Sequence, residues 1–590
     1  MPDLIVNARV TTLDPATPEA DAVAIADGRI RVVGSASEAA AALASLAAGA
    51  PDDGARPRIL DAGGRRVVPG LIDMHAHLDR EGLKAAHPSM AGLNHRDDVL
   101  GRIAELARAA APGAWIITMP LGEPPFHFFE SPEAEAALYP TRGELDAAAP
   151  DNPVYVRPII GFWRWAPLPD RLVSCANSKA MAAVGLTDDS AAPSPSVTLE
   201  RDDHGRLTGR FFEATTVSIL ELTAFARAVR YGAGDRVEGL RRSMAVALGT
   251  GTTMVFEGHG VDPAVAEAYR HLHSTGALAI RAELVGSPRW NALSRSPVEA
   301  VSADFARLAG YGIGDDRLRE RGLFINLRAH PDDRIRGAAG PYTGLAGYHF
   351  DTALPAETGE NVLAAMARSG MRAVGLSPSM LDAYANAARH GPVAGNGWLV
   401  QHCGHFPPTA LEAALRHGVG ATFLPVEAIF KQAFIAHESP EIAPDWMPLR
   451  RVLRAGLPAS IATDNIPPSL FFALWCCLAR RDRDGRILPE PDGALSRLES
   501  LELATLGAAR CLGLDDRLGS IAPGKRADLA ILDRDFLTCD IDAIPSIRSV
   551  ATMVDGDWCH LDLSSSGPDG PGLLVETTDL REGRSRESTA

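Results

Sequence analysis

Short runs of alternating hydrophobic and polar residues mark the start of the chain. Residues 4–14, 22–34 and 59–69 follow this alternation, and an Asp-Gly pair at 27–28 lies between two apolar stretches. A period of two predicts half-buried strands, and Asp-Gly at such a place predicts a hairpin turn. We therefore expect a β-rich segment, interrupted by an Ala-rich helix at residues 36–50.

The same alternating pattern returns near the other end, at residues 519–535 and 547–563. Strands from both ends can share one core, because a sandwich needs two sheets with facing apolar sides. We predict a small β-sandwich made of residues 1–68 and 515–562. The Ser-, Gly- and Pro-rich, charged residues 563–590 predict a mobile C-terminal tail.

Between these ends, apolar runs are separated by Ala-rich stretches with helical periodicity. The runs with the length of buried strands are residues 153–161, 252–258, 277–286, 322–330, 371–377, 397–403, 420–426 and 458–465. Repeated strand–helix alternation predicts a parallel sheet, and about eight repeats are typical of a (β/α)8 barrel. We therefore predict an α/β fold in which a TIM barrel, residues 69–514, is inserted into the sandwich.

Composition narrows the class of protein. The chain has 46% hydrophobic residues, which predicts a large core, and a net charge of −16, which argues against nucleic acid or an anionic membrane as partner. No basic-then-apolar leader and no bilayer-length apolar run is visible, and the seven cysteines form no CxxC pair. These features predict a soluble, cytoplasmic protein.

Two histidines, His75 and His77, end the apolar run that begins at residue 67. In a strand, residues i and i+2 point to the same face, so both imidazoles would project together at the strand end. Paired imidazoles are ligands for zinc, iron or manganese. The alternative, from these residues alone, is a pair of loop histidines without a ligand.

The stretch VVPGLIDMHAHL, residues 67–78, resembles the first-strand signature of the amidohydrolase superfamily, and residues 517–535 resemble its closing sandwich motif. Residues 139–158, 175–186 and 505–514 resemble amidohydrolase family 3, in its N-substituted formamide deformylase-like branch. The resemblance covers nearly the whole chain. It implies a distorted barrel with a metal site collected from the strand ends.

The resemblance also implies roles for individual residues. His75 and His77 would bind the metal, His402 corresponds to the histidine of the sixth strand, and an aspartate of the eighth strand corresponds to Asp464. Asp464 would bind the metal and accept the proton of the attacking water, while His402 would bind the metal or polarise the substrate carbonyl. Taken alone, Asp464 in TDNIPPS is equally typical of a turn or helix cap.

The chain departs from the family pattern at two metal-binding positions. Asn326 stands where binuclear members have a lysine that is carbamylated to bridge two metals, and His330 stands at a neighbouring aspartate position. Gly375 or Leu376 occupies the place of a further histidine. We therefore expect one divalent metal, with zinc first and iron or manganese as alternatives, and no carbamylated lysine.

Other residues are candidates to replace the missing ligands. Glu257 and His259 have i, i+2 spacing at the end of an apolar run, so they would share one face. His405 and Cys403 are further candidates. A single residue of any of these types more often packs or caps than binds a metal.

Aromatic residues gather at two places that precede or follow predicted strands. Phe126 and Phe128 lie between proline turns, and Trp163 and Trp165 lie in the stretch FWRW. We name these four, with His330, as candidate substrate contacts that would favour a planar or bulky apolar molecule. A lid packed on the barrel, or an oligomer contact, would use the same aromatic residues.

The favoured function is metal-dependent hydrolysis of an amide-like C–N bond in a small molecule, with an aromatic substrate as one option. Two alternatives stay open: a metal-dependent lyase or decarboxylase acting on a C–C bond, and a ligand-binding descendant without catalysis. The expected partner is a small-molecule substrate, with no nucleic acid and no membrane. Formation of a homodimer is left open.

Overall fold

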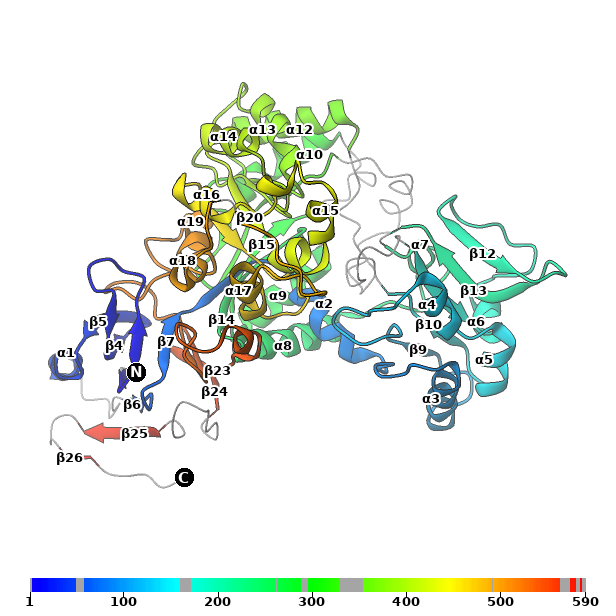
Figure 1. Ribbon diagram of the computed structural model, residues 1–590, viewed down its shortest axis with the longest axis horizontal. Helices are drawn as coiled ribbons and strands as arrows, with labels where there is room; N and C mark the ends of the chain where they lie inside the picture. The colour runs from blue at the N-terminus through cyan, green and yellow to red at the C-terminus, as the bar shows by residue number, and fades with distance from the viewer. Residues whose placement is uncertain are drawn as a thin grey trace.

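The chain forms three parts: a β-sandwich, a barrel, and a lobe inserted into the barrel (Figure 1). The computed structural model describes residues 3–48, 58–159, 171–215, 217–261, 263–287, 296–327, 354–490, 492–562, 574–579 and 584–585.

Both ends of the chain build the sandwich. Its two sheets have the strand orders β26-β25-β6-β1-β4-β5 and β24-β23-β22-β7-β2-β3. The strands are β1 (Asp3–Val6), β2 (Arg9–Thr11), β3 (Glu19–Ala20), β4 (Ala22–Ala26), β5 (Arg29–Gly34), β6 (Arg58–Asp61), β7 (Arg66–Pro69), β22 (Leu529–Leu532), β23 (Ser549–Val554), β24 (Asp557–Leu561), β25 (Leu574–Asp579) and β26 (Arg584–Ser585). Ile25 of the first sheet and Val67 and Leu529 of the second are buried in one core. The predicted sandwich from both chain ends is confirmed.

The predicted hairpin joins β4 and β5. Asp27 and Gly28 have φ angles of 52° and 69°. A two-residue turn of this type needs positive φ at both positions, which Asp-Gly adopts readily. The predicted Ala-rich helix is α1 (Ala36–Ala48), which packs against β4 and β5.

The C-terminal segment departs from the prediction of a mobile tail. β25 pairs antiparallel with β6, in a register that runs from Leu574 opposite Asp61 to Thr577 opposite Arg58. The prediction rested on the Ser, Gly and Pro content around this stretch and overlooked the β-branched residues inside it, which favour a strand. Part of the expected tail is therefore a strand of the sandwich.

Eight parallel strands form the barrel, in the order β8-β14-β15-β17-β18-β19-β20-β21. They are β8 (Leu71–Ala76), β14 (Thr252–Glu257), β15 (Arg281–Gly286), β17 (Leu318–Phe324), β18 (Ala373–Gly375), β19 (Leu399–Val400), β20 (Gly420–Phe423) and β21 (Ala459–Ile461), with β16 (Ile313–Gly314) paired to β17. Just beyond β21, the backbone N–H of Asp464 donates to the carbonyl of His75 at 2.9 Å. This bond joins the first and last strands, so the barrel is nearly closed.

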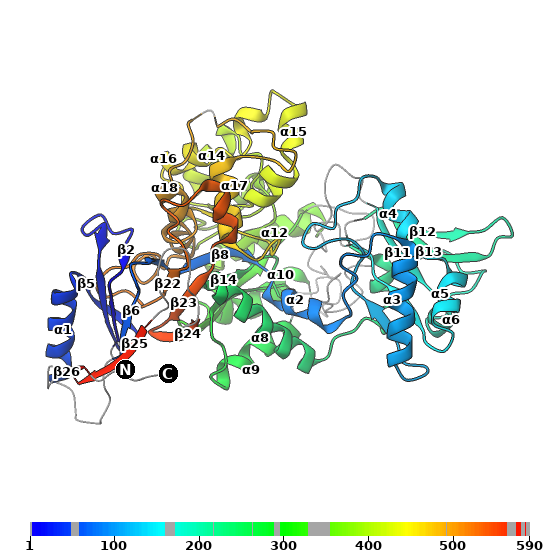
Figure 2. The same cartoon turned by 60° about the horizontal axis from the view of Figure 1, so that its bottom comes forward.

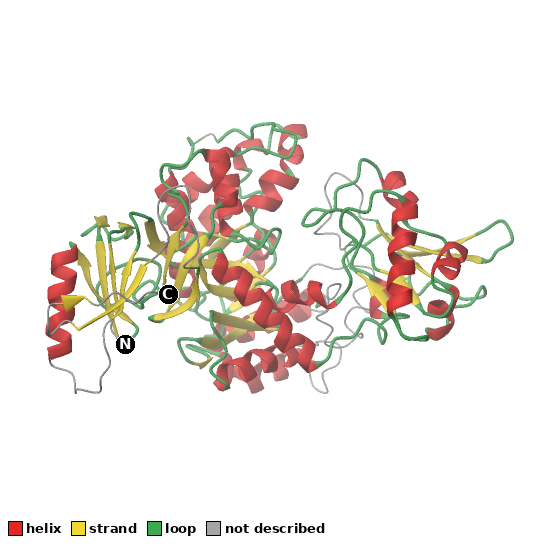
Figure 3. Cartoon of the chain, turned by 90° about the horizontal axis from the view of Figure 1, so that it is seen from below, coloured by secondary structure: helices red, strands yellow, loops and turns green. Residues whose placement is uncertain are grey.

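Helices surround the barrel strands, as Figure 3 shows in red around yellow. They are α2 (Leu78–Glu81), α8 (Ala233–Gly249), α9 (Pro263–Ser274), α10 (Pro297–Leu308), α12 (Ala356–Ser369), α13 (Leu381–Ala387), α14 (Pro408–His417), α15 (Ala433–Glu438), α16 (Leu449–Arg454), α17 (Leu470–Ala479), α18 (Arg497–Leu503) and α19 (Leu506–Leu512), with shorter turns η1 (Gly82–Ala86), η5 (Pro378–Met380), η6 (Val426–Lys431), η7 (Ala443–Asp445) and η8 (Ile541–Ser546). In the described part of the chain, none of these helices is long and apolar enough to cross a membrane.

The inserted lobe lies between β8 and β14 in the sequence and stands apart from the sandwich in both Figures 1 and 2. Its sheet has the order β12-β13-β11-β10-β9. The elements are β9 (Ile116–Thr118), β10 (Val154–Val156), β11 (Leu172–Ala176), β12 (Val197–Arg201) and β13 (Leu207–Glu213), with α3 (Arg96–Ala109), α4 (Pro132–Leu138), α5 (Arg142–Ala148), α6 (Ser178–Ala183) and α7 (Ile219–Leu222).

The apolar run 153–161 was expected to be a barrel strand, and this expectation is wrong. β10, its described strand, pairs with β9 and antiparallel with β11, inside the lobe. A strand buried on both faces has the same composition in either sheet, so the run alone does not tell which sheet it joins. The first barrel strand is β8, as the resemblance at residues 67–78 implied.

Candidate metal centre

The candidate ligands come from the carboxyl ends of four barrel strands. His75 lies in β8 and His77 follows it directly, while His259 follows β14, His402 follows β19 and Asp464 follows β21. In a barrel of parallel strands, the carboxyl ends meet at one face, so residues distant in the sequence are brought together there.

Four imidazoles and one carboxylate converge at this face. Nε2 of His77 lies 2.8 Å from Oδ1 of Asp464, and Nε2 of His75 lies 3.6 Å from the same oxygen. Nε2 of His402 lies 3.2 Å from Nε2 of His75 and 3.0 Å from Nε2 of His259. The structure thus brings together the four residues implied by the resemblance, and adds His259 from the proposed replacement pair.

Two of these residues have an uncommon backbone conformation. The φ angles are 50° at His402 and 51° at Asp464, and the next residue, Asn465, has 59°. Positive φ is unfavourable for residues with a side chain, and it persists where surrounding contacts impose it. Here the side-chain oxygen of Asn465 accepts the backbone N–H of His77 at 2.6 Å, which ties the two strand ends together.

Burial sets the protonation state of the imidazoles. It lowers the pKa of His75, His77 and His259 well below the ordinary value of 6.5, and neighbouring positive groups lower it further. For His77 the largest of these is the charge of Arg80, and for His75 and His259 a proton on an adjacent ring would repel a further proton in the same way. At neutral pH these rings are therefore uncharged, which is the form that binds a metal.

Gln401 fixes the orientation of His75. The Oε1 atom of Gln401 lies 3.0 Å from Nδ1 of His75, and its Nε2 donates to the carbonyl of Met74 at 3.1 Å. Because the amide oxygen can only accept, Nδ1 of His75 carries the hydrogen and its Nε2 presents a lone pair to the site.

Asp73 joins β8 to the end of β21. Its carboxylate accepts the backbone N–H of His75 at 3.2 Å, and both the backbone N–H and the hydroxyl of Thr463, at 3.1 and 2.6 Å. Burial raises the pKa of Asp73 to about 7 despite these bonds. Asp73 therefore positions the residues on either side of the barrel closure.

Glu257 belongs to a neighbouring group of buried side chains. Ligand-type atoms of Glu257, Asp79 and His77 lie within 4.8 Å of one another, and the hydroxyl of Tyr269 donates to Glu257. Burial, together with the charge of Asp79, raises the pKa of Glu257 well above its ordinary value. Glu257 thus lies behind His77, whereas its sequence partner His259 faces His402.

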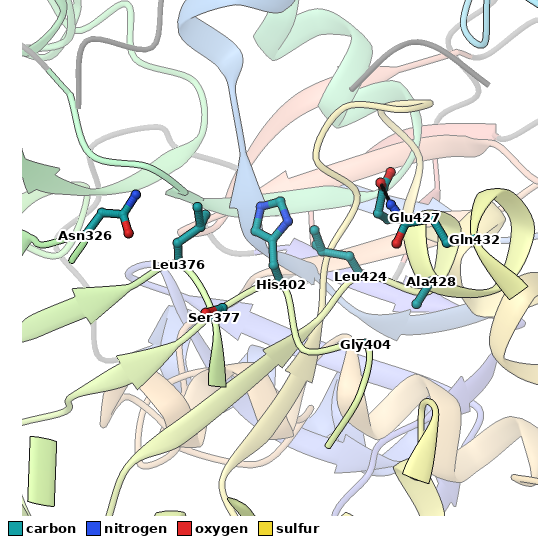
Figure 4. A pocket seen from close by; sticks show the side chains of 9 residues that line it. All are labelled: Asn326, Leu376, Ser377, His402, Gly404, Leu424, Glu427, Ala428 and Gln432. Atoms are coloured by element: carbon teal, nitrogen blue, oxygen red, sulfur yellow. Dashed lines mark hydrogen bonds between the residues drawn. The ribbon is translucent and has the colours of Figure 1, made fainter. Parts of the chain in front are cut away.

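A cavity of about 230 Å3 opens beside His402 (Figure 4). It is lined by Asn326, Leu376, Ser377, His402, Gly404, Leu424, Glu427, Ala428 and Gln432. Glu427 accepts a hydrogen bond from Lys431 at 2.9 Å and another from Gln432. Lys431 is the last residue of the π-helical turn η6 and Gln432 comes directly after it. Such π-helical turns often occur at functional sites.

The two positions that depart from the family pattern are walls of this cavity. Asn326 and Leu376 both line it. Gly375 has no room for a side chain, because an added Cβ would lie 2.6 Å from Cγ of Met380 and 2.7 Å from the hydroxyl of Tyr384. Leu376 is therefore the one of the two residues that faces the space beside His402.

The aromatic candidates occupy other places. Phe126 packs against Phe430 and Phe472, with ring centroids 5.0 and 5.9 Å apart, and so joins the lobe to the barrel. Phe128 is 39% exposed, and the guanidinium of Arg483 lies 3.1 Å from its ring centroid. Neither lines the cavity. The remaining candidates, Trp163, Trp165 and His330, lie outside the described residues.

The donor set fits a divalent metal ion. Neutral imidazole nitrogens that face one another lack enough hydrogens to satisfy all the close contacts among them, and Nε2 of His75 offers only a lone pair. Imidazole nitrogens and carboxylate oxygens are the ligands that zinc prefers in enzymes. His75, His402 and Asp464, and separately His75, His77 and His259, place such atoms within 4.8 Å of one another.

Sequence reasoning missed the residues that support this set. Asp73 shares the i, i+2 face of His75 and His77, so the alternation contained a signal for it. Gln401 carries no such signal beyond standing next to His402. Glu427 lies on an irregular turn that no periodicity predicts.

A barrel of parallel strands with imidazole and carboxylate ligands at their carboxyl ends is the architecture of metal-dependent hydrolases. The sequence profile of the amidohydrolase family matches residues 58–559, so the chain belongs to the amidohydrolase family. Members of this family depend on metal ions, and the chain is a hydrolase that acts on carbon–nitrogen bonds.

Individual relatives are similar over nearly the full length. The N-substituted formamide deformylase of Arthrobacter pascens is 27% identical over 582 residues, which cover 94% of this chain and 97% of the relative. Protein LONG AFTER FAR-RED 3 of Arabidopsis thaliana is 25% identical, over 94% of this chain and 90% of its own. The crystal structure of an uncharacterized metal-dependent hydrolase from Pyrococcus horikoshii matches 92% of this chain and 99% of its own, with a TM-score of 0.65 and 19% identity.

Proposed function

We propose that the chain hydrolyses an amide-like carbon–nitrogen bond of a small molecule, using one divalent metal ion, with zinc as the ion that the donor set favours. The observation that carries the proposal is the convergence of His75, His77, His259, His402 and Asp464 beside a cavity of about 230 Å3. A divalent metal ion bound there supplies Lewis acidity that makes water a nucleophile near neutral pH.

Each residue of the candidate metal centre has its own role in the proposed reaction. His75, His77 and His259 are neutral and buried, so they are suited to hold the metal ion. Asp464 would also hold the ion, and its carboxylate would accept the proton of the attacking water and return it to the leaving nitrogen. His402 lies between the ligands and the cavity, where its imidazole stabilises negative charge that develops on the substrate carbonyl oxygen.

The cavity indicates the class of substrate. Its lining combines apolar side chains, Leu376 and Leu424, with the amides of Asn326 and Gln432. An amide with one apolar substituent suits this mixed lining. The relative from Arthrobacter pascens is named for N-substituted formamides, so these are the first substrates to test.

The test compares metal-free and metal-loaded enzyme on N-benzyl and N-aryl formamides and on the matching acetamides, in 18O-labelled water. We expect chelation to abolish turnover and one equivalent of zinc per chain to restore it. The acid product should carry one 18O atom for each turnover.

Two results would contradict the proposal. Full turnover by protein shown to be metal-free would remove the role of the histidine cluster. An acid product without label would exclude hydrolysis and favour a lyase on the same scaffold.

A further inference from the structure

The opposite end of the barrel carries a cluster of arginines that serves no part of the proposed reaction. Arg319 and Arg321 lie on β17, and Arg372 precedes β18. They lie near Glu283 of β15 and the carbonyl of Leu512 at the end of α19. We call Glu283, Arg319, Arg321 and Arg372 the floor cluster.

The floor cluster has more positive than negative charge. Glu283 is fully buried, binds Arg372 closely, and lies 3.5 Å from Arg319. The next acidic group, Asp316, is 3.7 Å from Arg319 and is already paired with Arg517 at 2.7 Å. The chain as a whole carries a net charge of −16, so a local surplus of arginine is unusual in it.

Arg321 is the residue whose charge is least compensated. In the described part of the chain, it forms no salt bridge, and its Nε atom is buried without a hydrogen-bond partner. Its two contacts, to the carbonyls of Leu512 and Asn396, are both 3.4 Å long, which is weak for a charged donor. Burial and the nearby charge of Arg372 lower the pKa of Arg321 to about 10, which leaves it charged at neutral pH.

A cavity of about 480 Å3 opens at this position. Its lining includes Arg321 and Arg510, together with residues that precede barrel strands: Trp398 before β19, Gly418 before β20 and Pro458 before β21. The cavity is therefore at the amino-terminal face of the barrel, whereas His402 and the proposed reaction lie at the carboxyl-terminal face. Several of its other lining residues are glycines, which leave room for a ligand beside the guanidinium groups.

Stabilising the end of α19 is the competing role for these arginines. Arg372 does approach the last helical carbonyl, but its main partner is Glu283. Arg321 gains little from its two long contacts, and a guanidinium placed at the wall of an open cavity is suited to a planar oxyanion group. We propose that this cavity binds the phosphate or carboxylate group of a small anionic metabolite, with Arg321 and Arg510 as its ligands.

The experiment measures binding to the metal-loaded, full-length protein by calorimetry. Inorganic phosphate and citrate are titrated separately, each against sodium chloride of equal ionic strength. We expect saturable binding of at least one of the two probes, and a rise in melting temperature that chloride does not produce. Saturation by phosphate alone identifies a phosphorylated ligand, and saturation by citrate alone identifies a polycarboxylate; both results support the site.

Variants of the two arginines test whether the anion binds in this cavity. Arg321→Met should weaken binding by about 10-fold or more, because one charge-assisted hydrogen bond to the anion is lost. Arg510 is exposed, and its ion pair with Glu502 at 2.6 Å is a surface pair that contributes little to stability. Arg510→Glu should therefore fold and weaken binding through charge reversal even if Arg321→Met does not fold. Arg102→Ala, which removes an arginine from the surface of α3, should bind as the wild type does. Absence of saturable binding, or unchanged affinity in Arg510→Glu and Arg321→Met, overturns the proposal.

Discussion

Nε2 of His77 and Oδ1 of Asp464 lie 2.8 Å apart, although they come from the first and the last strand of the barrel. The same two strand ends are joined by the backbone bond from Asp464 to His75 and by the side chain of Asn465. The candidate metal centre therefore lies on the closure of the barrel. Changes to the closure should affect metal binding as well as stability.

Replacing Asp464 by Asn should lower kcat by about 10^3-fold, because an amide of the same shape does not accept a proton from water. The measurement is steady-state turnover together with the metal content of each protein. Asp382→Asn, which changes an exposed aspartate of α13, serves as the control and should keep full activity. An unchanged rate in Asp464→Asn would falsify the proton-transfer role of Asp464.

Replacing Gln401 by Leu should weaken zinc affinity by about 10- to 100-fold, because Nδ1 of His75 loses its acceptor. Gln401→Glu keeps an oxygen at this position and should retain most of the affinity. Competition with a chelator of known affinity gives the dissociation constants. Equal affinities in the two variants would show that the acceptor does not orient His75.

Replacing Gly258 by Ala should displace His75 and reduce bound zinc. An added Cβ at Gly258 would lie 2.5 Å from Cδ2 of the His75 ring and 2.6 Å from two other ring atoms, which is too close for any side chain. The cost of such overpacking is about 1–3 kcal/mol. Gly101→Ala in α3 is the matched control, since nothing lies near its Cβ and it should stabilise the helix by about 0.5–1 kcal/mol. Metal content and melting temperature of both variants test this; normal zinc content in Gly258→Ala would contradict it.

Replacing Phe126 by Ala should lower kcat/KM by about 10-fold, because the contact between the lobe and η6 is lost and Glu427 on η6 shifts beside the cavity. Phe128→Ala, in the same loop, removes an exposed ring and should have little effect. Kinetics on one substrate compare the two variants. The expected order of effects would be reversed if Phe128, and not Phe126, positioned this region.

His127 should make the protein less stable in acid. Burial lowers its pKa to about 4, although Nδ1 lies 2.8 Å from the carbonyl of Leu121. Between pH 6.5 and about 4, His127 is protonated in the unfolded chain but not in the folded chain. The free energy of unfolding therefore falls by about 1.4 kcal/mol for each pH unit in this range. Above pH 6.5 this contribution is constant.

The variant His127→Gln removes the titrating group, and all other groups are common to both proteins. The difference in unfolding free energy between wild type and variant should therefore shift by about 2 kcal/mol in favour of the variant between pH 7 and pH 5. Urea unfolding at the two pH values measures it. A difference that does not change with pH would show that the pKa of His127 is the same in the folded and the unfolded chain.

The sequence was sufficient to predict elements with a strong pattern. Alternation at both ends predicted the sandwich, and the resemblance at residues 67–78 led to His75 and His77, which the structure brings together with His402 and Asp464. Residues 153–161 were assigned to the barrel because a buried strand looks the same in any sheet, and only pairing partners decide.

Other features depend on contacts that no local pattern encodes. Gln401 orients His75 through an amide that reaches across the barrel from the end of β19, a strand that does not pair with β8, so its role appears only in three dimensions. The i, i+2 spacing made Glu257 and His259 equally good candidates for the metal site. In the structure Glu257 lies beside Tyr269, whereas His259 lies beside His402. The strand at Leu574–Asp579 forms because β6 offers it a pairing edge.

The closure of the barrel also bears on how the enzyme matures. Since β8 precedes β21 in the sequence, a nascent chain that has not yet reached β21 holds only part of the proposed ligand set. The complete candidate site can therefore form only after the last barrel strand has been made and has closed against the first.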